Sequence, residues 1–277
     1  MSLQSAGPPS PSFFSGVSVI FRMQIRRFAR GKKLRLALVA TGLIVFAVAA
    51  ARYAASGNTA GVDTAYVVEK AQEAVSKGLR WGFFSLLVFL LPFLFTSSAI
   101  GEEVEGRTFT YLAGRPVGRV AIAVGKWAAG TVMAVGLVIA SVLVLHIAAY
   151  ATEPTALVEA FPNTLRAAGS VGLLTCAYCS MCMCFGALVP EAAGVVAALY
   201  LGVIEFVGSM LPGAFRCVSI NYSAQQLMGL EKGGIAPEYA PDIAPMIALA
   251  VLVLFSFVFV ALTAIVVQTS EYRFSRS

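Results

Sequence analysis

The stretch from Trp127 to Tyr150, WAAGTVMAVGLVIASVLVLHIAAY, contains no Asp, Glu, Lys or Arg. About 20 consecutive apolar residues are enough for an α-helix to cross the hydrocarbon core of a bilayer. A transmembrane β-strand would be roughly 10 residues long and would alternate between apolar and polar residues, which this stretch does not do. It therefore predicts a membrane-spanning helix.

The rest of the chain has the same character. Of its 277 residues, 58% are hydrophobic and 12% are charged, and the mean hydropathy is +0.83. Soluble domains carry about 25% charged residues, so this chain lacks the polar residues needed to cover a water-facing surface. The composition excludes a soluble protein and predicts an integral membrane protein.

Six apolar segments are long enough to span a bilayer. They are Leu36–Ala55, Trp81–Ile100, Trp127–Tyr150, Ala167–Val189, Ala192–Leu211 and Ala244–Val267. Because backbone groups in lipid must be satisfied internally, we expect an all-α integral membrane protein with six transmembrane helices. The expected organisation is a disordered N-terminus (1–12), a cytoplasmic interfacial helix (13–33), a six-helix membrane domain (34–270) and a cytoplasmic tail (271–277).

The distribution of Lys and Arg predicts the orientation, since these residues are enriched in cytoplasmic loops. With six spans, both termini share one side with the loop before Trp127, and that side holds 13 of the 20 basic residues. Both termini are therefore predicted to be cytoplasmic, in a multi-pass protein of the plasma (inner) membrane. An alternative interpretation of the first apolar segment is a signal peptide, but about 30 residues precede it, which is long for such a region.

The region from Phe13 to Lys33 places apolar residues three or four apart, and arginines cluster toward its end. The apolar positions are Phe14, Val17, Phe21, Ile25 and Phe28. This spacing indicates an amphipathic helix on the cytoplasmic face of the membrane, held by anionic lipid. The alternative is a soluble cytosolic helix.

A charged segment, GEEVEGRTFTYLAGRPVGR (Gly101–Arg119), separates the second and third spans. Its glutamates lie where a first helical turn favours negative charge, and Glu103 and Arg107 are four residues apart in the favourable order. Gly114 is a natural helix end and Pro116 prevents continuation. The segment predicts a short amphipathic helix across the cytoplasmic ends of the two spans. On these grounds alone it either pins the loop to the interface or binds a soluble protein.

The same segment resembles the signature of type-2 ABC transporter permeases. The matching residues are Glu102, Glu103, Glu105, Gly106, Thr108, Leu112, Pro116, Val117, Arg119, Gly125 and Lys126. One departure is Arg107, which separates Gly106 from Thr108, two residues that the family usually keeps adjacent. The basic interfacial helix, the six spans and a long last outer loop are similar to the family along the whole chain.

In that family the segment is a coupling helix, which docks into a groove on a separate ATPase subunit. The resemblance implies that role for Glu102, Glu103, Glu105, Gly106, Arg107, Thr108, Tyr111, Leu112, Arg115 and Pro116. The chain contains no Gly-x4-Gly-Lys-Ser/Thr sequence, so we expect no catalytic residues here and ATP and Mg²⁺ on the partner. The expected partners are an ABC ATPase, a second permease copy and membrane lipid, with no nucleic acid.

Polar residues inside the spans are further candidates. Glu205 lies in the fifth span, where an acid is costly; it either lines the translocation path or holds a proton, or it is a protonated or paired side chain that packs the bundle. The cluster CAYCSMCMC (Cys176–Cys184) carries soft ligands that suit Cu(I), but small residues also suit helix contacts in lipid, and we expect no metal site. His146 is expected to be a packing residue.

These features favour the membrane subunit of an ABC transporter, coupling ATP hydrolysis to export or movement of a substrate. The first alternative is the same architecture used as a mechanical device acting on an extracytoplasmic partner. The second is an ion-coupled carrier using Glu205; such carriers often contain inverted repeats, and we find none.

The predicted orientation is tested by cysteine labelling. Ser5→Cys and Ile235→Cys should react with a membrane-impermeant maleimide from opposite sides of the membrane, because position 5 precedes the first span and position 235 lies in the last outer loop. Labelling of both positions from one side would contradict six spans with cytoplasmic termini.

Overall fold

The computed structural model describes residues 12–56, 64–97, 99, 118–151, 153–205, 219–228 and 244–269. All regular structure in these ranges is helical. Four helices are long and apolar enough to cross a membrane. They are α2 (Lys32–Ser56), α7 (Arg119–Tyr150), α9 (Phe161–Leu188) and α13 (Pro245–Thr269). These helices agree with the prediction of an all-α membrane protein and with four of the six predicted spans.

The second predicted span is one continuous helical run from residue 64 to residue 97. Its pieces are α3 (Thr64–Lys77), the π-helical η1 (Gly78–Leu87), α4 (Val88–Pro92) and the π-helical η2 (Phe93–Ser97). Pro92 cannot donate a backbone hydrogen bond, and the turn that follows it is π-helical.

The fifth predicted span is described as far as Glu205. It begins with a single turn, η3 (Pro190–Ala192), which follows α9 directly, as the tight inner turn predicted at Pro190 requires. The helices α10 (Ala193–Leu199) and η4 (Tyr200–Glu205) follow. Residues 206–218 lie outside the described ranges. The number of six spans therefore stays a prediction.

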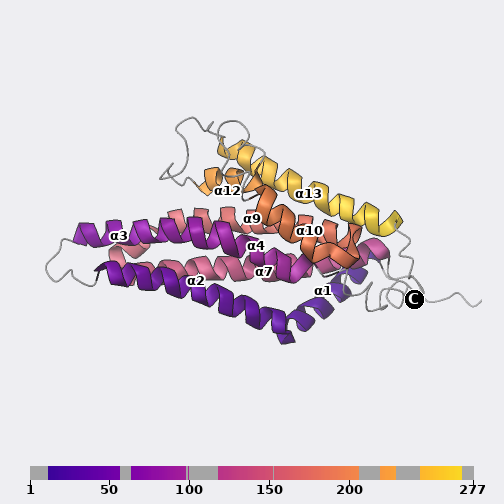
Figure 1. The fold of residues 1–277 in the computed structure, drawn as a ribbon, viewed down its shortest axis with the longest axis horizontal. Coiled ribbons are helices and arrows are strands. Elements are labelled where there is room, and N and C mark those ends of the chain that lie inside the picture. Colours follow the sequence, from indigo (N-terminus) through magenta and orange to yellow (C-terminus); the bar gives the residue numbers. More distant parts are fainter. Residues whose placement is uncertain are drawn as a thin grey trace, which may run out of the picture.

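Helix α9 lies at the centre of the bundle. In its most apolar 18-residue window 78% of residues are buried inside the protein, compared with 17% in α2 and 17% in α13. Figure 1 shows α2 and α13 on opposite sides of the molecule, with α7 and α9 between them. Because α2 and α13 leave most of their apolar side chains uncovered, they present the lipid-facing surfaces of the bundle.

Glycines bring several helices into close contact. A Cβ atom at Gly78 would lie 2.7 Å from Val48 of α2, and one at Gly82 would lie 2.6 Å from Ile44. On α7, a Cβ atom at Gly130 would lie 2.6 Å from the Thr96 side chain and 3.2 Å from the backbone of Phe95. Small residues allow such close backbone approach, which is the main source of packing energy between helices in lipid.

The N-terminal helix α1 (Phe13–Arg30) begins at Ser12, whose hydroxyl accepts a hydrogen bond from the Ser15 amide. Its buried side is the row Gly16, Ile20, Gln24 and Phe28, which packs against the bundle. Of the predicted apolar face, Phe14 is 81% exposed. Helix α1 therefore leans on the bundle as well as offering apolar and basic side chains to the membrane surface.

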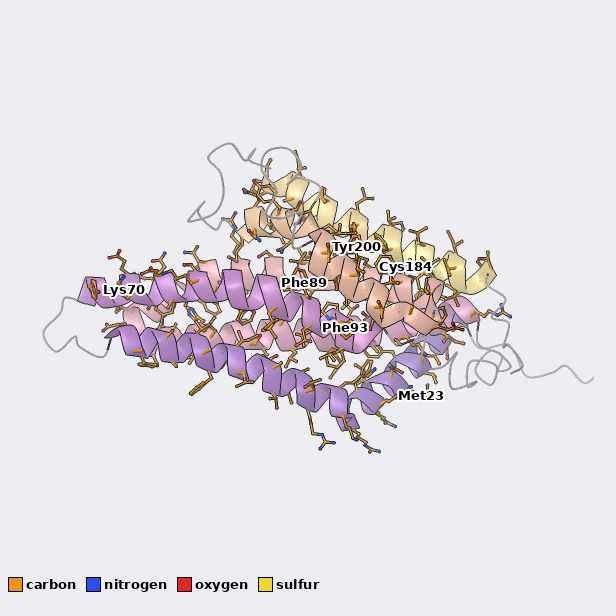
Figure 2. All side chains as sticks on the ribbon, viewed as in Figure 1. Met23, Lys70, Phe89, Phe93, Cys184 and Tyr200 are labelled. Carbon is orange, nitrogen blue, oxygen red and sulfur yellow. The ribbon has the colours of Figure 1, made fainter. Side chains whose placement is uncertain are left out.

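The opposite end of the molecule carries an ordered layer outside the predicted spans. Ala71 of α3 packs with Ala149 and Tyr150 at the end of α7 and with Ala156 of α8 (Pro154–Glu159). On α3, Lys70 and Lys77 donate hydrogen bonds of 2.8 and 2.6 Å to Glu73 and hold the pKa of that carboxyl at about 2. Figure 2 shows Lys70 on this layer and Met23 of α1 toward the other end. Asp63 directly precedes α3 in the sequence, and its residue type predicts an N-cap there, but Asp63 lies outside the described residues.

The close contact between α7 and the second span predicts a difference between two glycines of one helix. Gly130→Leu should lower the thermal stability of the purified protein by about 1–3 kcal/mol, because the added side chain meets the backbone of Phe95. Gly136→Leu is the matched control, since a Cβ atom at Gly136 has no neighbour within 4 Å. Equal melting temperatures for the two variants in detergent would contradict the described packing.

Candidate functional site

The ten residues predicted to form the coupling helix, numbered from 102 to 116, lie outside the described residues. Their role therefore stays a prediction. The structure does describe the chain on either side of them: Ala99 at the end of the second span, and Gly118 and Arg119 at the start of α7.

A buried lysine connects these two flanks. The Lys126 ammonium on α7 donates a hydrogen bond of 2.6 Å to the backbone carbonyl of Ala99. Lys126 is only 1% exposed. The last carbonyls of a helix lack partners within the helix and carry partial negative charge, so a cation is favoured at that position. The end of the second span is thus capped by the third.

The same end of the second span lies close to the backbones of two other helices. Gly130 of α7 makes room for Thr96, and Gly186 of α9 faces the carbonyl oxygen of Ser97 so closely that a Cβ atom could not fit. The Thr96 hydroxyl donates a hydrogen bond of 2.7 Å to the carbonyl of Pro92. The last turn before the charged segment is therefore packed closely against the backbones of α7 and α9.

Helix α1 joins the same place from the other side of α7. A Cβ atom at Gly125 would lie 2.9 Å from the Ile20 side chain and 3.0 Å from the Val17 carbonyl oxygen. Nearby, the rings of Phe28 and Phe95 meet edge to face with centroids 5.2 Å apart. We call the contacts of Gly125 and Lys126 with α1 and Ala99 the cytoplasmic junction, after the orientation predicted from the sequence. It unites α1, the second span and α7.

The second constellation surrounds Glu205, which is 2% exposed. Its Oε2 atom accepts hydrogen bonds from the Tyr178 hydroxyl (3.1 Å), the Ser219 hydroxyl (2.9 Å) and the Asn221 amide (3.4 Å). Tyr178 belongs to the central helix α9, whereas Ser219 and Asn221 stand at the start of α12 (Ile220–Met228). The acid predicted inside the fifth span is therefore a buried, paired side chain.

Two side chains from other helices cap α12. Ser219 stands at its N-cap, accepting a hydrogen bond of 3.4 Å from the Tyr222 amide, and Glu205 places a carboxylate at the same positive end. At the other end, Arg166 of α9 donates a hydrogen bond of 2.8 Å from Nε to the Leu227 carbonyl. Glu205 at the N-terminal end of α12 and Arg166 at its C-terminal end both match the sign of the helix dipole. This geometry favours a structural role for Glu205, holding α12 against α9.

His146 is also fully paired. Its Nε2 lies 3.0 Å from the Leu157 carbonyl oxygen of α8, and its Nδ1 lies 2.8 Å from the Thr164 hydroxyl of α9. The ring therefore links α7 to two neighbouring elements, in agreement with its interpretation as a packing residue.

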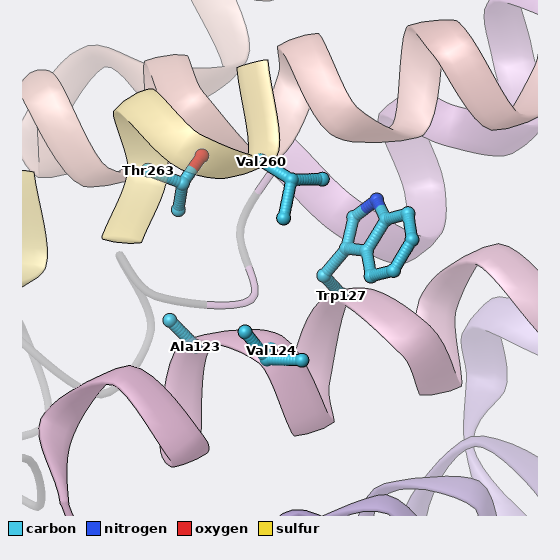
Figure 3. A pocket seen from close by; sticks show the side chains of 5 residues that line it. All are labelled: Ala123, Val124, Trp127, Val260 and Thr263. Atoms are coloured by element: carbon cyan, nitrogen blue, oxygen red, sulfur yellow. The ribbon is translucent and has the colours of Figure 1, made fainter. Parts of the chain in front are cut away.

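The cysteines of α9 are free thiols, and within the described ranges no group of three or more His, Cys, Asp or Glu is placed to hold a metal ion. A shallow hollow lies between α7 and α13, lined by Ala123, Val124, Trp127, Val260 and Thr263 (Figure 3). The Trp127 indole donates a hydrogen bond of 3.0 Å to the Ser180 hydroxyl. The hollow is apolar apart from the Thr263 hydroxyl and offers no constellation for chemistry.

Comparison with protein families shows the family to which the chain belongs. Residues 19–230 match the model described as "ABC-2 family transporter protein". The chain belongs to the ABC-2 family of transporter proteins. The match covers more than half of the 277 residues and includes the charged segment, the cytoplasmic junction and Glu205, but not α13. A search of curated proteins found no match.

The chain is thus the membrane permease of an ABC transporter, a multi-pass integral membrane protein. Sequence reasoning on this ABC-2 permease identified Glu205 and Lys126 but not their partners. Tyr178, Ser219 and Arg166 were not singled out as site residues, because their roles arise from which helices are neighbours. The sequence did indicate that such partners exist, because a single lysine or glutamate within an apolar segment requires a hydrogen-bonding or charged partner.

The Glu205 cluster predicts the behaviour of α12. Glu205→Ala leaves three donors without an acceptor, at about 1 kcal/mol or more each, and should loosen α12. A Met228→Cys reporter, placed in a background without native cysteines, should then react with maleimide roughly tenfold faster or more.

The conservative variant supplies the control. Glu205→Gln keeps an acceptor oxygen for the two hydroxyls and should show a much smaller increase in reporter labelling. Unchanged labelling in Glu205→Ala would mean that the cluster does not hold α12.

Proposed function

We propose that this ABC-2 permease couples ATP hydrolysis by a separate ABC ATPase to export or movement of a substrate across the membrane. The observation that carries the proposal is the charged segment Gly101–Arg119, which interrupts an otherwise apolar chain. The helix predicted to bear Glu102, Glu103 and Glu105 is not needed merely to connect two spans, and its charges suit binding to a soluble partner. The family match over residues 19–230 supports the proposal.

ATP and Mg²⁺ belong to the partner in this proposal, because the permease lacks a phosphate-binding loop. ABC-2 permeases generally pair with an ATP-binding subunit, and we expect a second permease copy to complete the translocation path. The cytoplasmic junction adds physical support: both flanks of the charged segment are tied to buried parts of the bundle, so a force on the segment would reach α7 and the second span together.

A second candidate is a mechanical role toward an extracytoplasmic partner. The ordered layer formed by α3, α8 and the end of α7 favours it, since that layer offers a surface beyond the predicted spans. The two candidates share the ATPase and differ in whether reconstituted vesicles accumulate a substrate.

Reversal of the three acids tests the proposal. Glu102, Glu103 and Glu105 changed together to Lys should release the co-purifying ATPase while the permease remains inserted. A desolvated charge pair that loses one member costs several kcal/mol, whereas an exposed pair contributes less than about 1 kcal/mol. Gly106→Trp should have the same effect by preventing close approach. The yield of ATPase on the affinity-purified permease is the measurement.

The matched control is Glu191→Lys, which reverses an exposed acid at the predicted cytoplasmic turn between α9 and α10. A simple interfacial pin would respond differently, because added lysines strengthen attraction to anionic lipid. Full ATPase recovery and unchanged ATP turnover in the triple variant would overturn the proposed role of the segment.

A further inference from the structure

We propose that Lys126 is a positioning residue, which makes the charged segment move as one body with the second span and α7; this inference rests on the proposed function. The motif resemblance assigns Lys126 no role. The geometry of Lys126 indicates a role, because its ammonium group donates a hydrogen bond to the Ala99 carbonyl and so connects the residues on either side of the segment.

The first argument is the cost of the arrangement. An ammonium group that is 1% exposed has given up its hydration, and such burial is unfavourable unless hydrogen bonds and charges compensate. A connection required only for packing could be made by an apolar side chain at lower cost. The chain instead places a directional donor 2.6 Å from one particular carbonyl, that of Ala99.

The second argument is the position of that carbonyl. Ala99 follows the last π-helical turn, and the charged segment begins two residues later. The segment ends at Arg119, the first residue of α7, and Lys126 lies about two helical turns further along. The hydrogen bond therefore closes a ring, formed by the backbone and the Lys126 side chain, that contains the whole segment.

The third argument comes from the preceding residue. Successive residues of a helix point about 100° apart, so Gly125 and Lys126 face different neighbours. Gly125 admits α1 to within 3.0 Å of where its Cβ atom would be, and Lys126 holds the second span. Displacement of the charged segment is thereby shared by the interfacial helix and both spans, as an input to a conformational change requires.

The test separates binding of the ATPase from its coupling. In the complex of permease and ATPase, Lys126→Met should leave ATPase recovery unchanged, because the docking residues are intact. The permease-dependent part of ATP turnover should fall about tenfold, a size typical of coupling between sites. Thermal stability should fall only slightly, because Met keeps the volume of the side chain while the Ala99 carbonyl loses a donor. Lys126→Arg should retain part of the coupling.

Lys77→Met is the matched control, because it removes an exposed lysine of α3, an element that lies toward the other end of the molecule from α1 (Figure 1). It should leave ATPase recovery and turnover at the level of the unmodified complex.

Cross-linking supplies a second readout that a purely structural role would not move. Ala99 and Ala123 belong to one buried cluster, so the thiols of Ala99→Cys and Ala123→Cys, in a background without native cysteines, should form a disulfide cross-link under mild oxidation. In the Lys126→Met background the cross-link should form more slowly, and once formed it should restore permease-dependent ATP turnover.

Three results would overturn the inference. They are full coupling in Lys126→Met, a parallel loss of stability and ATPase recovery in that variant, and a cross-link that forms normally but restores nothing. Failure of the proposed function is distinguishable, because it appears in the Glu102, Glu103 and Glu105 variant, whose ATPase would then remain bound although Lys126 is unchanged.

Discussion

The hydrogen bond between the Lys126 ammonium and the Ala99 carbonyl is the contact on which the arrangement of the predicted cytoplasmic end depends. It fixes where the second span ends relative to α7. The glycines at 125, 130 and 186 then let α1, the second span and α9 approach that point at backbone distance. In lipid, where hydrophobic burial does not distinguish one helix neighbour from another, such close packing and directed polar contacts decide which helices associate.

The buried polar residues around Glu205 are likewise paired with one another. Glu205, Tyr178 and Ser219 are buried, yet each is hydrogen-bonded within the group, since both hydroxyls donate to the Glu205 carboxyl. Together with Arg166 they satisfy the two ends of α12, a nine-residue helix that would be marginal alone. The polar residues of this permease thus serve mainly to attach short elements to long ones, while the long helices are specified by apolar sequence.

The long helices were predictable because hydropathy alone specifies them. Helices α2, α9 and α13 lie where apolar runs of about 20 residues predicted them. Helix α7 begins at Arg119 instead of Trp127, because the apolar run ends at Lys126 while the helix continues toward the cytoplasmic side. Helix α12 begins directly after Ser219, and serine is one of the residue types that commonly precede a helix.

Other features could not be predicted from one sequence. The π-helical turns around Pro92 depend on how the second span packs, and the acceptor of Lys126 is a backbone carbonyl, which every residue carries. The buried row of α1 contains Gly16 and Gln24 beside Ile20 and Phe28, because the side of α1 that faces the bundle is set by its contact with α7, where Ile20 packs on Gly125. The partners of Glu205 required knowledge of which helices are neighbours.

The order of residues in the Glu205 cluster has a consequence for biosynthesis. Tyr178 precedes Glu205 by 27 residues and is synthesised first, whereas Ser219 follows the acid by 14 residues. As the chain leaves the ribosome, the carboxyl group reaches the membrane with one partner from α9 already in place. The remaining donors are synthesised with α12. Arg166 has been synthesised earlier and can donate its hydrogen bond to the Leu227 carbonyl once the far end of α12 is present. Because all of these residues precede α13 in the chain, the contacts can form in the order of translation without any residue of α13.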